Sequence, residues 1–164
     1  MRLAGDKHEN ERFGALRAVV QRVSQASVQV NGALAASIGE GLVCLVAVRT
    51  DDTDGDVRYI GDKLVNLRIF EDEAGKLNRS LLETGGDALL ISQFTLYGDA
   101  RKGRRPGFID AANGEKAIEL YEALCEEVAR KGVRVGRGVF GADMKVALVN
   151  DGPVTILLDS RKEF

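Results

Sequence analysis

The chain has 164 residues, of which 45% are hydrophobic and 29% are charged, and its net charge at pH 7 is −2. This composition is typical of one globular domain, and the charge excludes a strongly basic protein that coats nucleic acid non-specifically. No apolar run approaches the 18 residues that a membrane-spanning helix needs, so we expect a cytoplasmic protein without a membrane partner.

The polar segment at 1–15 differs from the rest of the chain. It shows no periodicity and lacks the apolar middle of a signal peptide. We therefore expect 1–15 to be a disordered leader or an expression tag, followed by one domain over 16–164.

Cysteine and histidine usage narrows the chemistry. Cys44 and Cys125 lie in apolar and helical patterns, so we expect buried, reduced thiols, and no cysteine spacing suits a zinc site. The single histidine, His8, lies in the leader, which leaves the domain without an imidazole base. We therefore expect no Ser-His-Asp triad, no metal and no cofactor.

The first half of the domain predicts strands joined by tight turns. Arg17 to Val30 reads as a strand region, and Asn31-Gly32 supplies the positive-φ residues of a hairpin turn. A return strand over 33–38 follows. The continuous apolar run over 42–48 is then typical of a fully buried strand.

The second half mixes helices and strands. The expected elements are a helix from a polar turn at 50–54 to Leu67, a strand-loop region over 68–78 with its turn at 74–76, a buried strand over 88–96, a helix over 115–130 capped by Gly132, and strands over 145–150 and 154–158. Strands outnumber helices. We expect one α+β domain, a barrel-like or sandwich arrangement of mostly antiparallel strands with about two flanking helices.

Two polar segments at strand ends are not explained by packing alone. In Ser92-Gln93-Phe94-Thr95-Leu96, alternation along the strand places Gln93 and Thr95 on one face. That pattern fits either a strand running out to an edge or a group of hydrogen-bonding side chains at a site. In 150–155, Pro153 cannot donate to a sheet ladder and so marks a turn or a bulge.

A basic loop over 101–108 is the third such segment, and its two glycines and one proline exclude a helix. Its four cations are Arg101, Lys102, Arg104 and Arg105. They form either solvated surface or a loop that contacts phosphate, to which the fork geometry of guanidinium is suited.

Taken in order, these segments resemble one family. The series QRVSQASVQVNG, RIFEDEAGKLN, SQFTL, GRRPGF, FGADMKV and NDGPVT strongly resembles the D-aminoacyl-tRNA deacylases from about Leu16 to Leu158. SQFTL and NDGPVT match the two signature motifs of that family. The resemblance implies a cytoplasmic hydrolase that cleaves the ester bond of D-aminoacyl-tRNA, releases the free D-amino acid and tRNA, and rejects L-aminoacyl-tRNA.

The resemblance assigns this chiral selection to Gly152 and Pro153. Their peptide bond is cis in the family, and the two carbonyl oxygens would hold the α-ammonium group and exclude a side chain on the L side. Glycyl-tRNA, which has no side chain to clash, would also be hydrolysed. Arg22 matches the position that holds this motif in place. The motif enters the partner's pocket, which implies a homodimer with active sites at the interface.

The resemblance also implies a substrate pocket. Ser92, Gln93 and Thr95 match its catalytic segment, Phe140 and Met144 match residues that embrace the terminal adenine, and the basic loop would contact tRNA phosphates. Thr95 is either a nucleophile or a pocket residue beside a water activated by the 2′-hydroxyl of the terminal ribose. The sequence favours the second reading, because its motif contains no histidine or lysine to activate the threonine.

The alternative is a non-catalytic tRNA- or nucleic-acid-binding module of the same fold. The intact Gln93, Thr95 and Gly152-Pro153 set argues against it. A zinc- or triad-dependent hydrolase is a third class, and the missing ligands and base argue against that one.

Overall fold

The computed structural model describes residues 15–164, so the expected leader lies outside the described residues except for Ala15, which is buried. In chain order the elements are β1 (Arg17–Val30), β2 (Ala33–Ile38), β3 (Gly41–Ala47), α1 (Asp54–Asn66), β4 (Phe70–Glu71), β5 (Leu77–Arg79), α2 (Leu81–Thr84), β6 (Asp87–Ser92), the 3₁₀ helix η1 (Phe94–Tyr97), α3 (Gly114–Arg130), β7 (Val135–Arg137) and β8 (Met144–Asp159). Within 15–164, no helix combines the length and the apolar character needed to span a membrane.

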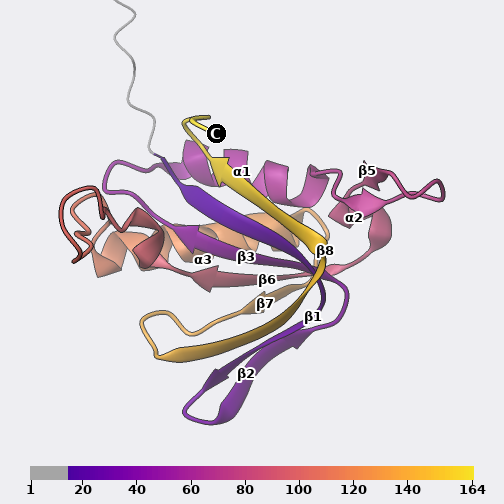
Figure 1. Cartoon of the computed structure of the whole chain (residues 1–164), viewed down its shortest axis with the longest axis horizontal. Helices are drawn as coiled ribbons and strands as arrows, with labels where there is room; N and C mark the ends of the chain where they lie inside the picture. Colours follow the sequence, from indigo (N-terminus) through magenta and orange to yellow (C-terminus); the bar gives the residue numbers. More distant parts are fainter. Residues whose placement is uncertain (1–14) are drawn as a thin grey trace, which may run out of the picture.

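The long strand β1 organises the main sheet (Figure 1). Its first half pairs antiparallel with β3, its second half pairs antiparallel with β2, and β8 pairs antiparallel along nearly its whole length. On the other side of β3, β6 and β7 continue the sheet in parallel. The result is a strand-rich, nearly closed sheet, which confirms the expected α+β, barrel-like domain with mostly antiparallel pairing.

The core has two parts, because β3 and β6 are apolar on both faces. Leu42, Cys44 and Val46 of β3 belong to the larger part, which packs against α1 and α3. Val43 points to the opposite face and joins a smaller cluster inside the curled sheet. This alternation explains why the apolar run over 42–48 is continuous, since strands buried on both faces lose the apolar-polar period. Cys44 and Cys125 are buried and free, as predicted.

Turn and cap residues fix the connections between these elements. Asn31 and Gly32 adopt φ values of 51° and 75°, as the predicted hairpin requires. The backbone N–H of Thr53 donates to Asp56 Oδ2 at 2.8 Å, so helix α1 begins with a reciprocal cap. After the C-terminal end of α3, Gly132 adopts a φ of 104° and its N–H donates to the Ala129 oxygen at 3.0 Å.

Three details differ from the sequence-based expectation. Strand β6 ends at Ser92, and the chain then turns into η1, because the N–H of Leu96 donates to the Gln93 oxygen at 3.1 Å. Strand β8 is one element with an internal bulge instead of two separate strands. The short helix α2 and the three-residue strand β7 were not predicted, because each carries too few residues to show a period.

Candidate functional site

The turn after β6 carries the first group of predicted site residues. The N–H of Gln93 donates to the Val46 oxygen at 2.7 Å, which is the last bond of the parallel ladder before η1. The Gln93 side-chain amide donates to the hydroxyl of Thr95. The prediction that these two share one face of a strand is therefore wrong, since Thr95 lies in η1. The turn nevertheless brings the amide and the hydroxyl into contact.

A cavity of about 420 Å³ opens beside this turn. Its walls include Ser92, Gln93 and Phe94 from the turn, Phe140 from the segment between β7 and β8, and Met144, the first residue of β8. Small residues form much of the remaining wall, namely Ala112, Gly114, Ala117, Gly141 and Ala142. The structure thus joins four of the predicted residues, Ser92, Gln93, Phe140 and Met144, in one hollow of the size that small ligands occupy.

Phe140 and Met144, the aromatic and thioether residues of this cavity, each pack against a neighbouring residue. The ring of Phe140 packs 6.3 Å from the ring of Tyr121, whose hydroxyl donates to the Leu90 oxygen at 2.7 Å. Met144 packs against Gly138, where an added Cβ would lie 2.7 Å from the sulfur. Both side chains are half-buried, so each retains a surface that a ligand can contact.

The Gly152-Pro153 motif forms the bulge in β8. On β1, Gln21 pairs with Thr155 and Val23 pairs with Asn150, so four residues of β8 lie opposite the single residue Arg22. The Gly152-Pro153 peptide bond is cis, as the resemblance implied, and both residues are exposed. Bulges of this kind direct a short stretch of main chain away from its sheet.

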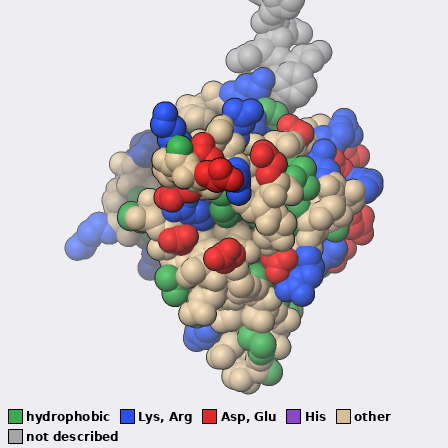
Figure 2. All heavy atoms as spheres, turned by 90° about the vertical axis from the view of Figure 1, so that its right-hand side faces the viewer, with side chains coloured by type: hydrophobic (Ala, Val, Ile, Leu, Met, Phe, Trp, Pro, Cys, Tyr) green, Lys and Arg blue, Asp and Glu red, His purple; other side chains and the backbone are tan. Residues whose placement is uncertain are grey.

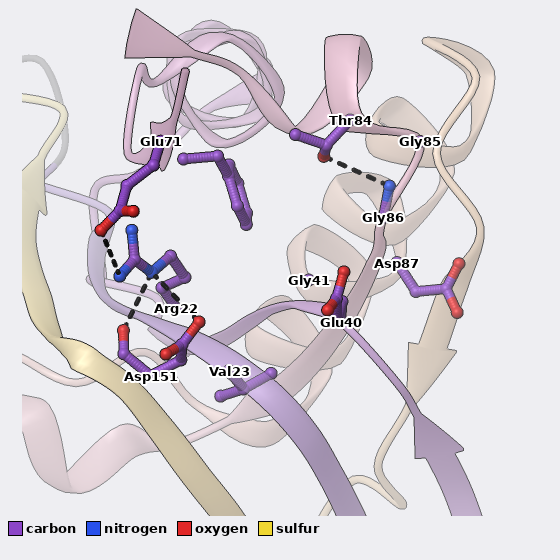
Figure 3. Close-up of a pocket in the computed structure, with 11 residues that line it drawn as sticks. Arg22, Val23, Glu40, Gly41, Glu71, Thr84, Gly85, Gly86, Asp87 and Asp151 are labelled. Atoms are coloured by element: carbon purple, nitrogen blue, oxygen red, sulfur yellow. Dashed lines mark hydrogen bonds and ion pairs between the residues drawn. The ribbon is translucent and has the colours of Figure 1, made fainter. Parts of the chain in front are cut away.

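Arg22 holds this bulge through hydrogen bonds to main-chain oxygens. Its Nε donates to the main-chain oxygen of Asp151 at 2.9 Å, and its Nη1 donates to the Ile69 oxygen at 2.9 Å. The residue is 6% exposed, and Glu71 and Asp151 lie near its guanidinium group (Figure 3). A second clamp comes from Asn150, whose side-chain amide donates to the oxygens of Arg22 and Val154 at 3.0 and 2.9 Å.

A separate cavity of about 400 Å³ opens beside Arg22. Four carboxylate residues line it, namely Glu40, Glu71, Asp87 and Asp151, together with glycines of the turn before β6. Figure 2 shows acidic side chains spread across the middle of the face that carries α2 and β5. Among residues 15–164, no group of three or more potential ligands is arranged to hold a metal ion. No sequence pattern indicates this cavity, because its acidic residues come from four separate segments.

Within one chain, the motif and the Gln93 cavity lie on different strands and are separated along the sheet. Arg22, opposite Gly152-Pro153, pairs with Leu42 of β3, and Leu42 pairs with Ala88 of β6. Ala88 precedes Ser92 by four residues, or about 13 Å of strand, and the path also crosses three strand spacings of about 4.8 Å each. Neither of the two cavities described above has residues of both groups in its walls.

The basic loop is fully exposed and partly neutralised. Arg101 donates to Asp99 through Nε at 2.9 Å and Nη2 at 2.8 Å, and this pairing lowers the pKa of Asp99 to about 2. Lys102, Arg104 and Arg105 form no ion pair with any residue of the described range. These three cations therefore remain available to a ligand.

The chain is similar to known proteins over nearly the whole described domain. The family model for D-Tyr-tRNA(Tyr) deacylase matches residues 19–159. The chain belongs to this family. A D-aminoacyl-tRNA deacylase of Anaeromyxobacter dehalogenans (strain 2CP-C) is 60% identical over 149 residues, which are 91% of this chain and 100% of the relative. Another from Clostridium botulinum (strain 657 / Type Ba4) is 56% identical over the same lengths.

Solved structures give the same fold. The structure named c-Myc DNA Unwinding Element Binding Protein is 41% identical, with a TM-score of 0.81 over 87% of this chain and 97% of that chain. A probable eukaryotic D-amino acid tRNA deacylase shares the fold at 23% identity, with a TM-score of 0.79 over 88% of this chain and 99% of that chain. Membership of the D-Tyr-tRNA(Tyr) deacylase family confirms the prediction of a deacylase that was drawn from the ordered motifs.

Proposed function

We propose that this chain hydrolyses the ester bond of D-aminoacyl-tRNA and releases the free D-amino acid and tRNA. The observation that carries the proposal is the 420 Å³ cavity, whose walls combine Ser92 and Gln93 with Phe140 and Met144 in a member of this family. An aminoacyl ester needs positioning and oxyanion stabilisation more than a strong nucleophile. The proposed substrate is a component of translation, so we place the enzyme in the cytoplasm.

The cavity wall suits the terminal adenosine of the tRNA. An aromatic ring and a polarisable sulfur are good surfaces for a base, so Phe140 and Met144 are the proposed adenine contacts. Gln93 and Ser92, which line the same cavity, would then lie near the ester. Their amide and hydroxyl groups can donate to the oxygen on which negative charge develops.

Thr95 contacts Gln93 but does not itself line the 420 Å³ cavity, and we propose that it supports the pocket and is not the nucleophile. Its hydroxyl accepts a hydrogen bond from the Gln93 amide, and an amide nitrogen that donates cannot remove a proton. No imidazole lies within residues 15–164, because the only histidine of the chain is His8. The attacking group is then a water molecule, which the vicinal 2′-hydroxyl of the terminal ribose activates.

We propose that Gly152 and Pro153 select for chirality. Their carbonyl oxygens would accept hydrogen bonds from the α-ammonium group and close the space that an L side chain needs. Main-chain atoms can make this selection without reading the D side chain, so many D-amino acids should be accepted. Glycyl-tRNA, which has no side chain to exclude, should be hydrolysed as well.

We further propose that a second copy of the chain completes each site. Within a single chain, neither of the two cavities has Gly152-Pro153 and Gln93 together in its walls, and the exposed bulge is free to enter another copy's cavity. A mixture of Gly152→Ala and Gln93→Ala chains tests this arrangement. Each variant alone should be inactive, and refolding them together should restore about a quarter of the wild-type activity per chain on statistical pairing of subunits.

Activity of the mixture no greater than the sum of its parts would contradict the shared site. Sedimentation of each variant supplies the control, since both substitutions must leave the homodimer intact for the comparison to hold.

Release of tyrosine from D-tyrosyl-tRNA by the purified chain tests the proposed function directly. We expect rapid hydrolysis that continues in the presence of a chelator and is lost in Gln93→Ala. Binding of tRNA without any release of tyrosine would contradict the proposal.

One comparison favours a second candidate function. The 41% identical structure is named as a protein that binds a DNA unwinding element. Unpaired Lys102, Arg104 and Arg105 could serve single-stranded DNA as well as tRNA. If single-stranded DNA bound as tightly as tRNA at the same salt concentration and no ester were cleaved, the binding-module alternative would be favoured.

A further inference from the structure

Phe94 and Phe108 form an exposed aromatic pair at the rim of the proposed adenosine cavity. Their ring centroids are 5.1 Å apart and their planes meet at 66°, the edge-on arrangement that aromatic rings favour. Phe94, which also lines the cavity, is 55% exposed, and Phe108 is 38% exposed. Large rings normally bury most of their surface, so an open pair beside a cavity offers surface to a ligand.

The pair is fixed to the turn that carries Thr95. An added Cβ at Gly98 would lie 3.0 Å from the Thr95 oxygen and 3.4 Å from Cε1 of Phe108. The Phe108 ring therefore packs directly on the main chain that follows η1. A ligand seated on this ring would lie against the same turn as the proposed ester site.

The basic loop leads away from this pair in an ordered form. Asp99 and Gly107 exchange two main-chain hydrogen bonds, of 2.8 and 2.9 Å, which close the loop at its base. The Asp99 side chain also accepts from the N–H of Arg101 at 3.0 Å. Because these contacts hold the loop, binding there costs less conformational entropy than ordering a free segment would.

A third cavity, of about 660 Å³, lies between the loop and η1. Its lining residues are Tyr97, Asp99, Arg101, Lys102, Arg105, Gly107, Ile109 and Asp110, among which cations outnumber carboxylates. Ile109 is 93% exposed and adds apolar surface at the edge of the cavity. A positively charged hollow next to open aromatic rings is the combination that binds single-stranded nucleic acid.

We propose that the Phe94–Phe108 pair and this third cavity form a subsite for the single-stranded nucleotides that precede the terminal adenosine of tRNA. The subsite rests on the proposed function and extends it beyond one nucleotide. A base stacks on the open aromatic surface, and the phosphate that follows contacts Lys102 and Arg105. The tRNA strand then runs from the adenosine cavity, across the rings, into the basic hollow.

Two substrates of different length test the subsite. One is D-tyrosyl-tRNA, and the other is the D-tyrosyl ester of adenosine alone, which cannot reach Phe108. For Phe108→Ala we expect kcat/KM on the tRNA to fall about tenfold, mainly through KM, since one base-ring stack has roughly that effect. On the adenosine ester the change should stay below about twofold in the same variant. Phe108→Tyr is the matched control, because it keeps the ring and should keep wild-type activity on both substrates.

Equal losses on the two substrates would overturn the subsite, because the ring would then act only through its packing on Gly98 and Phe94. No loss on either substrate would also overturn it. Failure of the subsite is distinguishable from failure of the proposed function: in the first case the wild-type chain still cleaves D-tyrosyl-tRNA, and in the second it cleaves neither ester.

Discussion

The Nε of Arg22 donates a hydrogen bond to the main-chain oxygen of Asp151 at 2.9 Å, directly before the exposed Gly152-Pro153 pair. The same guanidinium group reaches the Ile69 oxygen through Nη1. One buried side chain on β1 thus joins the β8 bulge to the segment before β4. Because these bonds run to carbonyl oxygens, they fix main-chain geometry, which is the feature that the proposed chiral selection uses.

Arg22→Lys should weaken both stability and catalysis. Lysine keeps the charge but cannot donate to two carbonyl groups in the fork geometry of guanidinium. We expect the free energy of unfolding to fall by about 2 kcal/mol, and kcat/KM for D-tyrosyl-tRNA to fall about 100-fold as the motif shifts. Urea unfolding and initial rates measure the two effects. Wild-type kcat/KM in a folded Arg22→Lys chain would show that the clamp does not position the motif.

Gly152→Ala should abolish selective hydrolysis while leaving the fold in place. Gly152 adopts a φ of 143°, and an added Cβ would lie 2.8 Å from the backbone nitrogen of Val154, so the bulge must move. We expect a loss of about 100-fold in kcat/KM for the D-ester. Gly39→Ala is the matched control, because its Cβ would meet nothing within 4 Å. Similar rates for the two variants would contradict a role for the Gly152 main chain.

Thr95→Val separates the two roles considered for this hydroxyl. Valine keeps the shape and removes the oxygen, so a pocket residue should lose no more than about tenfold in kcat, whereas loss of a nucleophile costs roughly 10⁴-fold or more. We expect the small effect. A tRNA ending in 2′-deoxyadenosine should instead react far more slowly with the wild-type chain. The reverse pattern would identify Thr95 as the attacking group.

Asp52 gives the fold a pH dependence unrelated to the ester. Burial, reinforced by the charges of Asp56 and Asp51, raises the pKa of its carboxyl group to about 7. The pKa of an aspartate in an unfolded chain is near 3.9, well below this folded value. The stability that the protonated Asp52 contributes is therefore complete below about pH 4 and is lost as the pH rises through 7. The folded chain should therefore lose up to about 1.4 kcal/mol per pH unit from this group across that window.

The Asp52→Asn variant removes that ionisation. Its amide oxygen can still accept from the N–H of Arg49, whose nitrogen lies 2.6 Å from Asp52 Oδ2 in the wild-type chain. Urea unfolding at pH 5 and pH 8 should show a smaller drop for the variant than for the wild-type chain. Parallel profiles would mean that other groups determine the pH dependence.

Local chemistry made much of the fold predictable. Asn31-Gly32 marks its hairpin because few residues accept positive φ, and 42–48 reads as buried because both faces of β3 are covered. The Gln93-Thr95 turn was misplaced, since nothing in SQFTL distinguishes a strand end from a 3₁₀ turn. What decides it is the bond from the Gln93 N–H to Val46, a residue on another strand.

Long-range partners account for the rest of the site. Arg22 was named from the family motif, but its bond to Ile69 spans 47 residues and leaves no periodic trace in the sequence. The sequence does not indicate a binding role for Phe108, because this residue follows a basic run whose charges are the evident feature. Only the fold brings its ring against Phe94.

The ratio of initial hydrolysis rates for D-tyrosyl-tRNA and L-tyrosyl-tRNA, measured on one preparation of the purified chain, tests the account most directly. We expect the D-ester to be cleaved at least about 100-fold faster, since an L side chain would be excluded by main-chain atoms that cannot move aside. Equal rates would contradict the chiral role of Gly152-Pro153, and release from neither ester would contradict the deacylase function itself.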